Sequence, residues 1–198
     1  MKHEKIGILG GTFNPIHFGH LKIAQFCKDE LSLDKILFVP AGLPPHKNPS
    51  EAYHHRAQMV QLAIENREDY LLAELEKPKQ EDPQKYNYTY ETLSKVSEKY
   101  PESKVYFIIG EDNVPEIKNW YKYKKLFNLA QFVVLSRKSD KKEFSDISYL
   151  DELIFLDMPK IDIASAKIRE KLKNNKKIKN LVPLKVWNYI NLHKLYKK

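Results

Sequence analysis

The chain has 198 residues, 42% hydrophobic and 30% charged, a composition typical of soluble globular proteins. This length suits one α/β domain better than two, so we expect a single domain over residues 1–198. The N-terminus has no apolar signal core and no apolar run approaches a membrane span, so we expect a cytoplasmic protein without membrane association.

The formal net charge of +8 calls for an anionic partner or a structural explanation. Many lysines lie between residues 167 and 198, where they alternate with apolar residues such as Ile168, Leu172 and Ile178. This pattern predicts the solvated face of packed helices. We favour it over a nucleic-acid-binding tail because no RGG, zinc-knuckle or RNP-like string accompanies it.

Strand-like and helix-like segments alternate along the chain. We expect strands at 6–9, 35–39, 70–75, 105–109, 132–135 and 153–156, and helices at 21–31, 52–66, 88–99 and from about residue 165. This alternation implies parallel strands with right-handed crossovers, so we predict an α/β fold: a Rossmann-like doubly wound parallel sheet with a helical C-terminus. Ligands of such sheets bind beyond the carboxyl ends of the strands.

The first strand is followed by the string GGTFNPIHFGHL, residues 10–21. Its two leading glycines allow a tight turn and close approach of a ligand. The helix that follows directs its free N–H groups and positive dipole end to the same place. His17 and His20 flank Gly19, so both imidazoles can reach one anion. We interpret this string as a site that stabilises charge on a polyphosphate.

Other interpretations of the string are structural. The glycines can be ordinary turn residues, and the histidines can cap the helix, lie in the core or bind a metal. A metal site has little support because the chain has one cysteine and no HExxH or CxxC motif, so we expect no protein-held metal. The one cysteine, Cys27, falls on the apolar face of the first helix and is expected to be a buried structural thiol.

The string resembles the nucleotidyltransferase superfamily marked by HxGH, and within it the bacterial nicotinate-nucleotide adenylyltransferases. Further segments are similar to motifs of that family: PPHK at 44–47, NYTYETL at 87–93, GED with a later tryptophan at 110–120, IASAKIR at 163–169, and the ending from 181 to 196. The resemblance therefore runs from the first strand to the C-terminus.

The resemblance implies transfer of AMP from ATP to nicotinate mononucleotide, giving nicotinate adenine dinucleotide and pyrophosphate in NAD biosynthesis. The attacking phosphate is already anionic, so positioning and charge stabilisation are expected to carry the rate. The expected partners are ATP and nicotinate mononucleotide, with no nucleic acid. Mg²⁺ is expected to enter with ATP, with few or no direct protein ligands. The sequence leaves a homo-oligomer open.

The resemblance also assigns residues to the phosphate end of the site. His17 and His20 are expected to stabilise the transferring α-phosphoryl group. Lys47, Ser165 and Arg169 are expected to hold the other phosphates, with Ser165 also capping its helix.

At the pyridine end, the backbone near Thr89 and Tyr121 is expected to meet the carboxylate, and Trp120 to stack on the ring. Gly110 and Asp112 are expected to hold a ribose. N–H groups at a helix start suit a carboxylate, so we expect the acid mononucleotide to be preferred over the amide. The expected catalytic residues are His17, His20, Lys47 and Arg169, and the expected substrate-binding residues are Gly10, Gly11, Thr12, Phe13, Thr89, Gly110, Asp112, Trp120, Tyr121, Arg137 and Ser165.

Several of these residues also have an ordinary structural interpretation. A polar residue before a helix is usually an N-cap, which would account for Asn87 or Thr89. Asp112 can likewise cap a helix containing Val114 and Ile117, and a tryptophan in a helical stretch is more often in the core.

The chain departs from the family pattern at a few positions. Asn14 stands where aspartate is often found, and Ala164 and Ala166 replace hydroxyl residues that could contact phosphate. After the third strand, Glu74-Leu75-Glu76-Lys77 departs from the family's acidic-plus-arginine pattern, with a longer polar insert at 77–85.

Two alternative functions remain in view. One is a different HxGH transferase, acting on phosphopantetheine or making a CDP-alcohol, against which the PPHK, TYETL and GED motifs argue. The other is a nucleotide-sensing or RNA-binding module without turnover. The basic C-terminal region favours that module slightly, and the intact HxGH argues against it.

Overall fold

The computed structural model describes residues 3–43, 49–79, 81–82, 86–136, 144 and 147–197. The strands of this part of the chain form one parallel sheet in the order β3-β2-β1-β4-β5-β6, which confirms the predicted Rossmann-like doubly wound fold. The strands are β1 (Lys5–Gly11), β2 (Lys35–Pro40), β3 (Tyr70–Leu72), β4 (Lys104–Gly110), β5 (Gln131–Ser136) and β6 (Leu153–Asp157). The α-helices are α1 (Phe18–Leu31), α2 (Tyr53–Ile64), α3 (Thr89–Lys99), α4 (Tyr123–Leu126), α5 (Ser165–Lys173) and α6 (Leu184–Leu192), and two 3₁₀ helices are η1 (Glu111–Asn119) and η2 (Leu150–Glu152).

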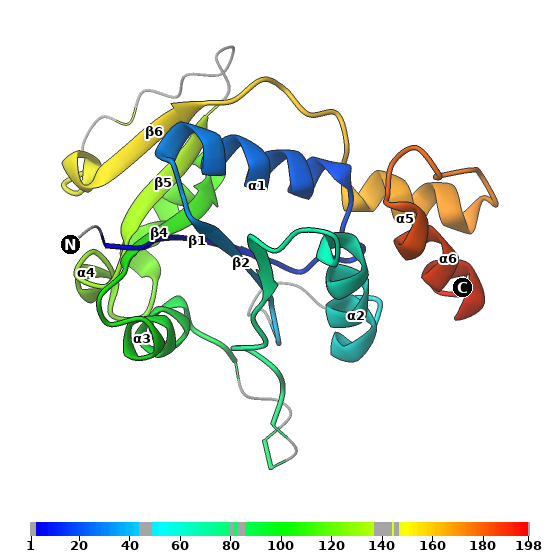
Figure 1. Cartoon of the computed structure of the whole chain (residues 1–198), viewed down its shortest axis with the longest axis horizontal. Coiled ribbons are helices and arrows are strands. Elements are labelled where there is room, and N and C mark those ends of the chain that lie inside the picture. The colour runs from blue at the N-terminus through cyan, green and yellow to red at the C-terminus, as the bar shows by residue number, and fades with distance from the viewer. Residues whose placement is uncertain are drawn as a thin grey trace.

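Helices cover both faces of the sheet. In Figure 1, α1 crosses one face, and α3 and α4 lie on the other. Successive residues of β1 point to opposite faces: Leu9 packs with α1, α2, α5 and α6, whereas Ile6 and Ile8 pack with α3, η1 and α4. Because both faces are buried, the central strands are continuous apolar runs, which is why the sequence predicts them well.

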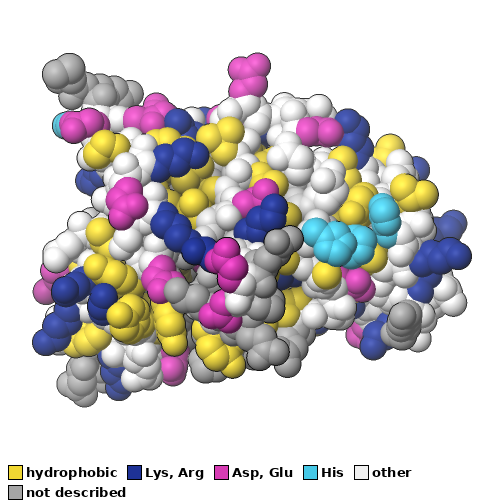
Figure 2. Space-filling view, turned by 90° about the horizontal axis from the view of Figure 1, so that it is seen from below, with side chains coloured by type: hydrophobic (Ala, Val, Ile, Leu, Met, Phe, Trp, Pro, Cys, Tyr) yellow, Lys and Arg dark blue, Asp and Glu magenta, His cyan; other side chains and the backbone are white. Residues whose placement is uncertain are grey.

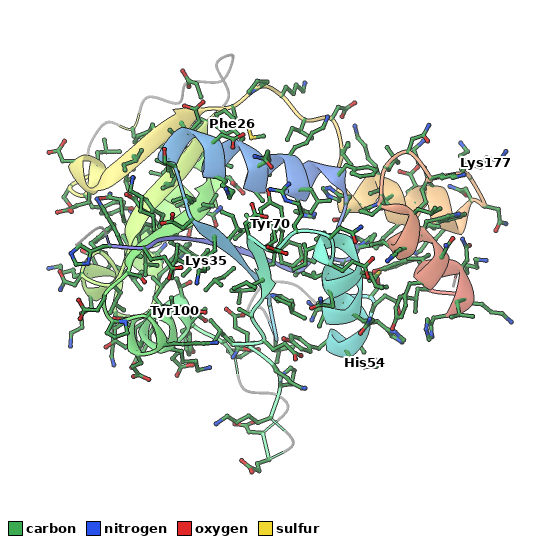
Figure 3. The ribbon with its side chains drawn as sticks, in the orientation of Figure 1. Phe26, Lys35, His54, Tyr70, Tyr100 and Lys177 are labelled. Atoms are coloured by element: carbon green, nitrogen blue, oxygen red, sulfur yellow. The ribbon has the colours of Figure 1, made fainter. Side chains whose placement is uncertain are left out.

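The C-terminal helices lie at one end of the molecule, where α6 packs against α2 (Figure 1). Ile168, Leu172 and Ile178 are buried, while Lys171 and Lys177 are exposed, so the predicted solvated face is confirmed. Lys177 is labelled in Figure 3 near the end of this region that lies away from the sheet. On the face drawn in Figure 2, lysine and arginine side chains are interspersed with aspartate and glutamate.

Several local features differ from the sequence-based expectation. β3 ends at Leu72 rather than residue 75, because its pairing with β2 ends where Leu72 lies opposite Phe38. The N-caps of α3 and α5 are Tyr88 and Ala164, so the caps expected at Asn87 or Thr89 and at Ser165 were wrong. The segment that contains Val114 and Ile117 is a 3₁₀ helix capped by Gly110.

Cys27 is fully buried, and burial raises the pKa of its thiol to about 12, so the predicted structural thiol is confirmed. Within the ranges that the structure describes, no helix has both the length and the apolar character needed to span a membrane.

Candidate active site

A cleft of about 610 Å³, here called the main cleft, opens at the carboxyl ends of the strands. The chain order of the sheet reverses between β1 and β4, and this switch point is where doubly wound folds bind ligands. Seven of the expected site residues line the main cleft: Gly10, His17, His20, Thr89, Gly110, Trp120 and Ser165.

The turn after β1 is held in shape by side chains from other elements. Arg56 donates to the carbonyl of Thr12 at 2.8 Å, Arg169 to that of Asn14 at 2.8 Å, and Ser165 to that of Pro15 at 3.0 Å. These contacts explain why the hydroxyl of Ser165 is not the helix cap: it bonds to the turn instead. The expected phosphate-binding turn is thus fixed before any ligand arrives.

Phe13 supports this turn from within the core. It adopts a left-handed backbone conformation with φ of 46°, and its side chain is almost fully buried. Its ring meets the ring of His20 edge-on, with centroids 5.0 Å apart. A Cβ added at Gly11 would lie 3.3 Å from the Phe13 ring. The structure therefore places Phe13 beneath the site rather than in the lining of the main cleft.

Asn14 fills a buried position that uses both ends of its amide. Its Oδ1 accepts a hydrogen bond from the Tyr196 hydroxyl at 2.8 Å, and its Nδ2 donates to the Ser50 hydroxyl at 3.2 Å. An amide can accept from one neighbour and donate to the other. Asparagine therefore satisfies both contacts at the position where the resemblance more often has aspartate.

The rings of His17 and His20 stack, with centroids 3.8 Å apart and planes inclined by 22°. The backbone N–H of His17 donates to Nδ1 of His20 at 3.2 Å, so neutral His20 carries its proton on Nε2. A Cβ added at Gly19 would lie 2.8 Å from Nδ1 of His17. A side chain at position 19 would therefore displace the His17 ring.

Both imidazoles are neutral at pH 7 in the absence of an anion. Burial lowers the pKa of His17 to about 4. Burial, followed by the proximity of His17, also lowers the pKa of His20 well below its usual value. A bound polyanion would favour the protonated form and oppose this shift. The pair can therefore donate hydrogen bonds from neutral rings or gain charge when phosphate enters.

Trp120 and Thr89 lie at the other end of the main cleft. Trp120 is half-buried and packs on Phe107 and Phe132, with ring centroids 6.4 and 6.3 Å away, so it belongs partly to the core and partly to the cleft lining. Thr89 is the first residue of α3. Neighbouring Asn87 also lines the main cleft, and its Oδ1 accepts from the backbone N–H of Leu43 at 3.4 Å instead of capping α3.

Asp112 and Tyr121 are not among the described residues that line the main cleft. Asp112 folds back over Gly110, where an added Cβ would come 2.5 Å from its Oδ1. Asn113 bonds to the Gly110 carbonyl at 3.2 Å and faces the cleft instead. The ring of Tyr121 is exposed and packs on Tyr88.

A buried network lies behind the Thr89 end. Glu76 lines the main cleft, accepts from the Thr92 hydroxyl at 2.8 Å and from the Gly42 N–H at 3.3 Å, and burial raises its pKa. Arg56 is 2% exposed and donates to the carbonyls of Thr12, Gly42 and Glu51. Its position on the buried face of α2 was the available signal.

Arg169 lines a different cavity of about 380 Å³, the second cleft, together with Lys173 and Lys194. Arg169 is bonded to the carbonyl of Asn14 and does not line the main cleft with the histidine pair. The expected residues Lys47 and Arg137 fall outside the described residues. The expected residue Thr12 accepts a hydrogen bond from Arg56 through its backbone carbonyl and is not among the described residues that line the main cleft.

Among the described residues, no group of three or more His, Cys, Asp or Glu side chains is arranged to hold a metal ion. The one carboxylate in the described lining of the main cleft, Glu76, already accepts two hydrogen bonds from the protein.

Comparison with known proteins places this chain in a family. Residues 8–171 match the family model described as cytidylyltransferase-like. The chain is 38% identical to a probable nicotinate-nucleotide adenylyltransferase of Caldicellulosiruptor saccharolyticus, over 98% of this chain and 100% of that protein. It is 37% identical to a protein of the same name from Clostridium tetani, again over 98% and 100% of the two chains.

Solved structures agree. The nicotinic acid mononucleotide adenylyltransferase of Plasmodium falciparum complexed with NaAD superposes with a TM-score of 0.77, at 25% identity and over 98% of each chain. The same enzyme complexed with APC gives a TM-score of 0.75 at 25% identity, again over 98% of each chain. The chain therefore belongs to the cytidylyltransferase-like nucleotidyltransferases, and within them to the nicotinate-nucleotide adenylyltransferase family.

Proposed function

We propose that this chain transfers AMP from ATP to nicotinate mononucleotide, forming nicotinate adenine dinucleotide and pyrophosphate as a step of NAD biosynthesis in the cytoplasm. The observation that carries the proposal is the stacked His17–His20 pair at the switch point of the sheet, in a chain that matches nicotinate-nucleotide adenylyltransferases along its whole length. The solved relatives bound to NaAD and to APC support nucleotide substrates.

In the proposed reaction the 5′-phosphate oxygen of the mononucleotide bonds to the α-phosphorus of ATP. The bond from that phosphorus to the bridging oxygen breaks, and pyrophosphate leaves with the electron pair. The acceptor phosphate is anionic, so no side chain has to act as nucleophile. The work left to the protein is to align the two phosphates and to stabilise the charge that develops between them.

The residues of the main cleft suit that work. The backbone N–H of His17 bonds to Nδ1 of His20, which leaves the Nε2–H of His20 able to donate to the transferring phosphoryl group. This donor lies in the first turn of α1, whose N-terminal end also favours an anion. Trp120 offers an aromatic edge for the pyridine ring at the opposite end, where α3 begins. Mg²⁺ would enter as the counter-ion of ATP, held by phosphate oxygens and water.

The first test measures pyrophosphate release by the purified protein with ATP and one acceptor at a time. Release with nicotinate mononucleotide is expected, and release with phosphopantetheine, or from CTP with a phosphorylated alcohol, is not. Turnover with either of the latter in preference to the mononucleotide would identify a different transferase. Absence of turnover with every acceptor, together with nucleotide binding, would identify a sensing module.

The second test compares acid and amide acceptors at saturating ATP. A carboxylate gains about 1–3 kcal/mol more than an amide from N–H donors at a helix start, so kcat/KM should favour nicotinate mononucleotide by about fivefold or more. Equal or reversed values would show that the pocket near Thr89 does not read the carboxylate.

A further inference from the structure

The described lining of the main cleft contains one acidic and one permanently cationic side chain, Glu76 and Lys160. Glu76 follows β3 and Lys160 follows β6, the two edge strands of the sheet. The two charges therefore enter the main cleft from the segments that follow opposite edge strands. Lys160 attracts a polyanionic group to the part of the main cleft that it lines.

Lys160 lies on a segment that approaches the helix start carrying the histidine pair. The segment 158–163, which joins β6 to α5, lines the main cleft and packs on the start of α1. A Cβ added at Gly19 would lie 3.2 Å from Cγ2 of Ile161, the residue that follows Lys160. Lys160 therefore lines the main cleft and is adjacent in sequence to a residue that packs close to Gly19.

The ammonium group of Lys160 is available to a ligand. Lys160 is exposed and makes no hydrogen bond or ion pair within the described part of the chain. Asp162 is already paired with Lys167 at 2.7 Å, and that hydrogen bond is the main cause that lowers the pKa of Asp162, with Lys160 a minor one. The carboxylate of Asp162 therefore forms its ion pair with Lys167 and not with Lys160.

Other groups expected to bind phosphate hydrogen-bond to the protein backbone instead. The Ser165 hydroxyl donates to the Pro15 carbonyl, and Arg169 donates to the Asn14 carbonyl and lines the second cleft. Burial leaves the histidines uncharged before ligand binds. Of the described residues that line the main cleft, only Lys160 brings a permanent positive charge to a triphosphate.

We propose that Lys160 is a substrate-binding residue that contacts the β- or γ-phosphate of the nucleoside triphosphate. This inference rests on the proposed function for its ligand and goes beyond it in naming a residue that holds the triphosphate. A lysine on a flexible stem suits a phosphate chain, which changes geometry as pyrophosphate leaves.

The test is calorimetric titration of ATP and AMP into the wild-type chain, Lys160→Ala, Lys160→Arg and the control Lys171→Ala. Lys171 is an exposed lysine of α5 outside the lining of either cleft, so its change removes the same charge. In Lys160→Ala the Kd for ATP should rise about fivefold to twentyfold, as expected for one charge-assisted contact. The Kd for AMP should change less than about twofold, and Lys160→Arg should retain most of the ATP affinity.

Two results would overturn the inference. An unchanged Kd for ATP in Lys160→Ala would show that Lys160 does not bind the triphosphate. Equal weakening of ATP and AMP would show that it contacts the nucleoside instead. ATP binding requires no turnover, so a chain that binds ATP through Lys160 but makes no dinucleotide would contradict the proposed function alone. A chain that makes dinucleotide with kcat/KM for ATP unchanged in Lys160→Ala would contradict this inference alone.

Discussion

The backbone N–H of His17 donates to Nδ1 of His20, while the two rings stack with centroids 3.8 Å apart. One residue thereby fixes the tautomer of the other and covers it from solvent. Burial keeps the pair neutral, whereas a carboxylate partner would favour the charged form of the rings. It differs in this from a histidine–aspartate pair, and suits a site whose counter-charge arrives with the substrate.

Replacing His20 with alanine removes the Nε2–H donor proposed for the transferring phosphoryl group. We expect kcat to fall by about 10²–10³-fold, the usual loss for one donor to developing negative charge. Initial rates at saturating ATP and mononucleotide measure it. The control is His54→Ala, an exposed histidine on α2 labelled in Figure 3, which should keep kcat within about twofold. Wild-type turnover by a folded His20→Ala protein would refute the role.

The low pKa of His17 predicts acid destabilisation. Its folded value of about 4 lies below the ordinary value of 6.5, so the unfolded chain binds the proton more readily between these pH values. The stabilising contribution is complete above pH 6.5 and is lost as pH falls toward 4, amounting to about 3 kcal/mol. Urea unfolding of wild type and His17→Asn across this range should show a shallower pH dependence in the variant. Identical slopes would contradict the assignment.

Tyr196→Phe should destabilise the fold by about 1–2 kcal/mol, because it leaves buried Oδ1 of Asn14 without its 2.8 Å hydrogen bond. The midpoint of urea unfolding, at unchanged slope, measures the loss. Tyr121→Phe serves as the control, since the ring of Tyr121 is exposed and should contribute less than about 0.5 kcal/mol. Equal effects of the two changes would show that the contact to Asn14 is energetically unimportant.

Arg56→Lys tests the buried arginine that joins three backbone segments. A lysine keeps the charge but cannot donate along the three directions used toward Thr12, Gly42 and Glu51, so we expect a loss of about 2–4 kcal/mol. Arg67→Lys is the matched control, because Arg67 is exposed and pairs with Asp69 at the surface. The account fails if denaturant unfolding gives both variants wild-type stability.

The sheet could be predicted from the sequence because its central strands are buried on both faces and read as unbroken apolar runs, as in Val105 to Ile109. The histidine site could be predicted because its residues are contiguous in the chain. The edge strand β3 was overestimated because apolar residues continue beyond Leu72, where pairing with β2 ends.

The supporting network could not be predicted, since its partners are far apart in sequence and meet only in the fold. Arg56 and Thr12 are 44 residues apart, and Tyr196 and Asn14 are 182 apart. The caps failed for a related reason. Asn87 and Ser165 are suitable N-cap residues by local preference. Instead, the Asn87 side chain hydrogen-bonds to the backbone of Leu43, and the Ser165 side chain hydrogen-bonds to the backbone of Pro15. Tertiary contacts overrode local signals at both positions.

The most direct measurement of the central claim follows the phosphorus atoms of ATP. The purified chain is supplied with nicotinate mononucleotide and with ATP labelled either at the α- or at the γ-phosphorus. The account predicts that the α-label appears in nicotinate adenine dinucleotide and the γ-label in pyrophosphate, in equal amounts. Appearance of the γ-label in orthophosphate or on the acceptor, or of no label in a dinucleotide, would contradict it.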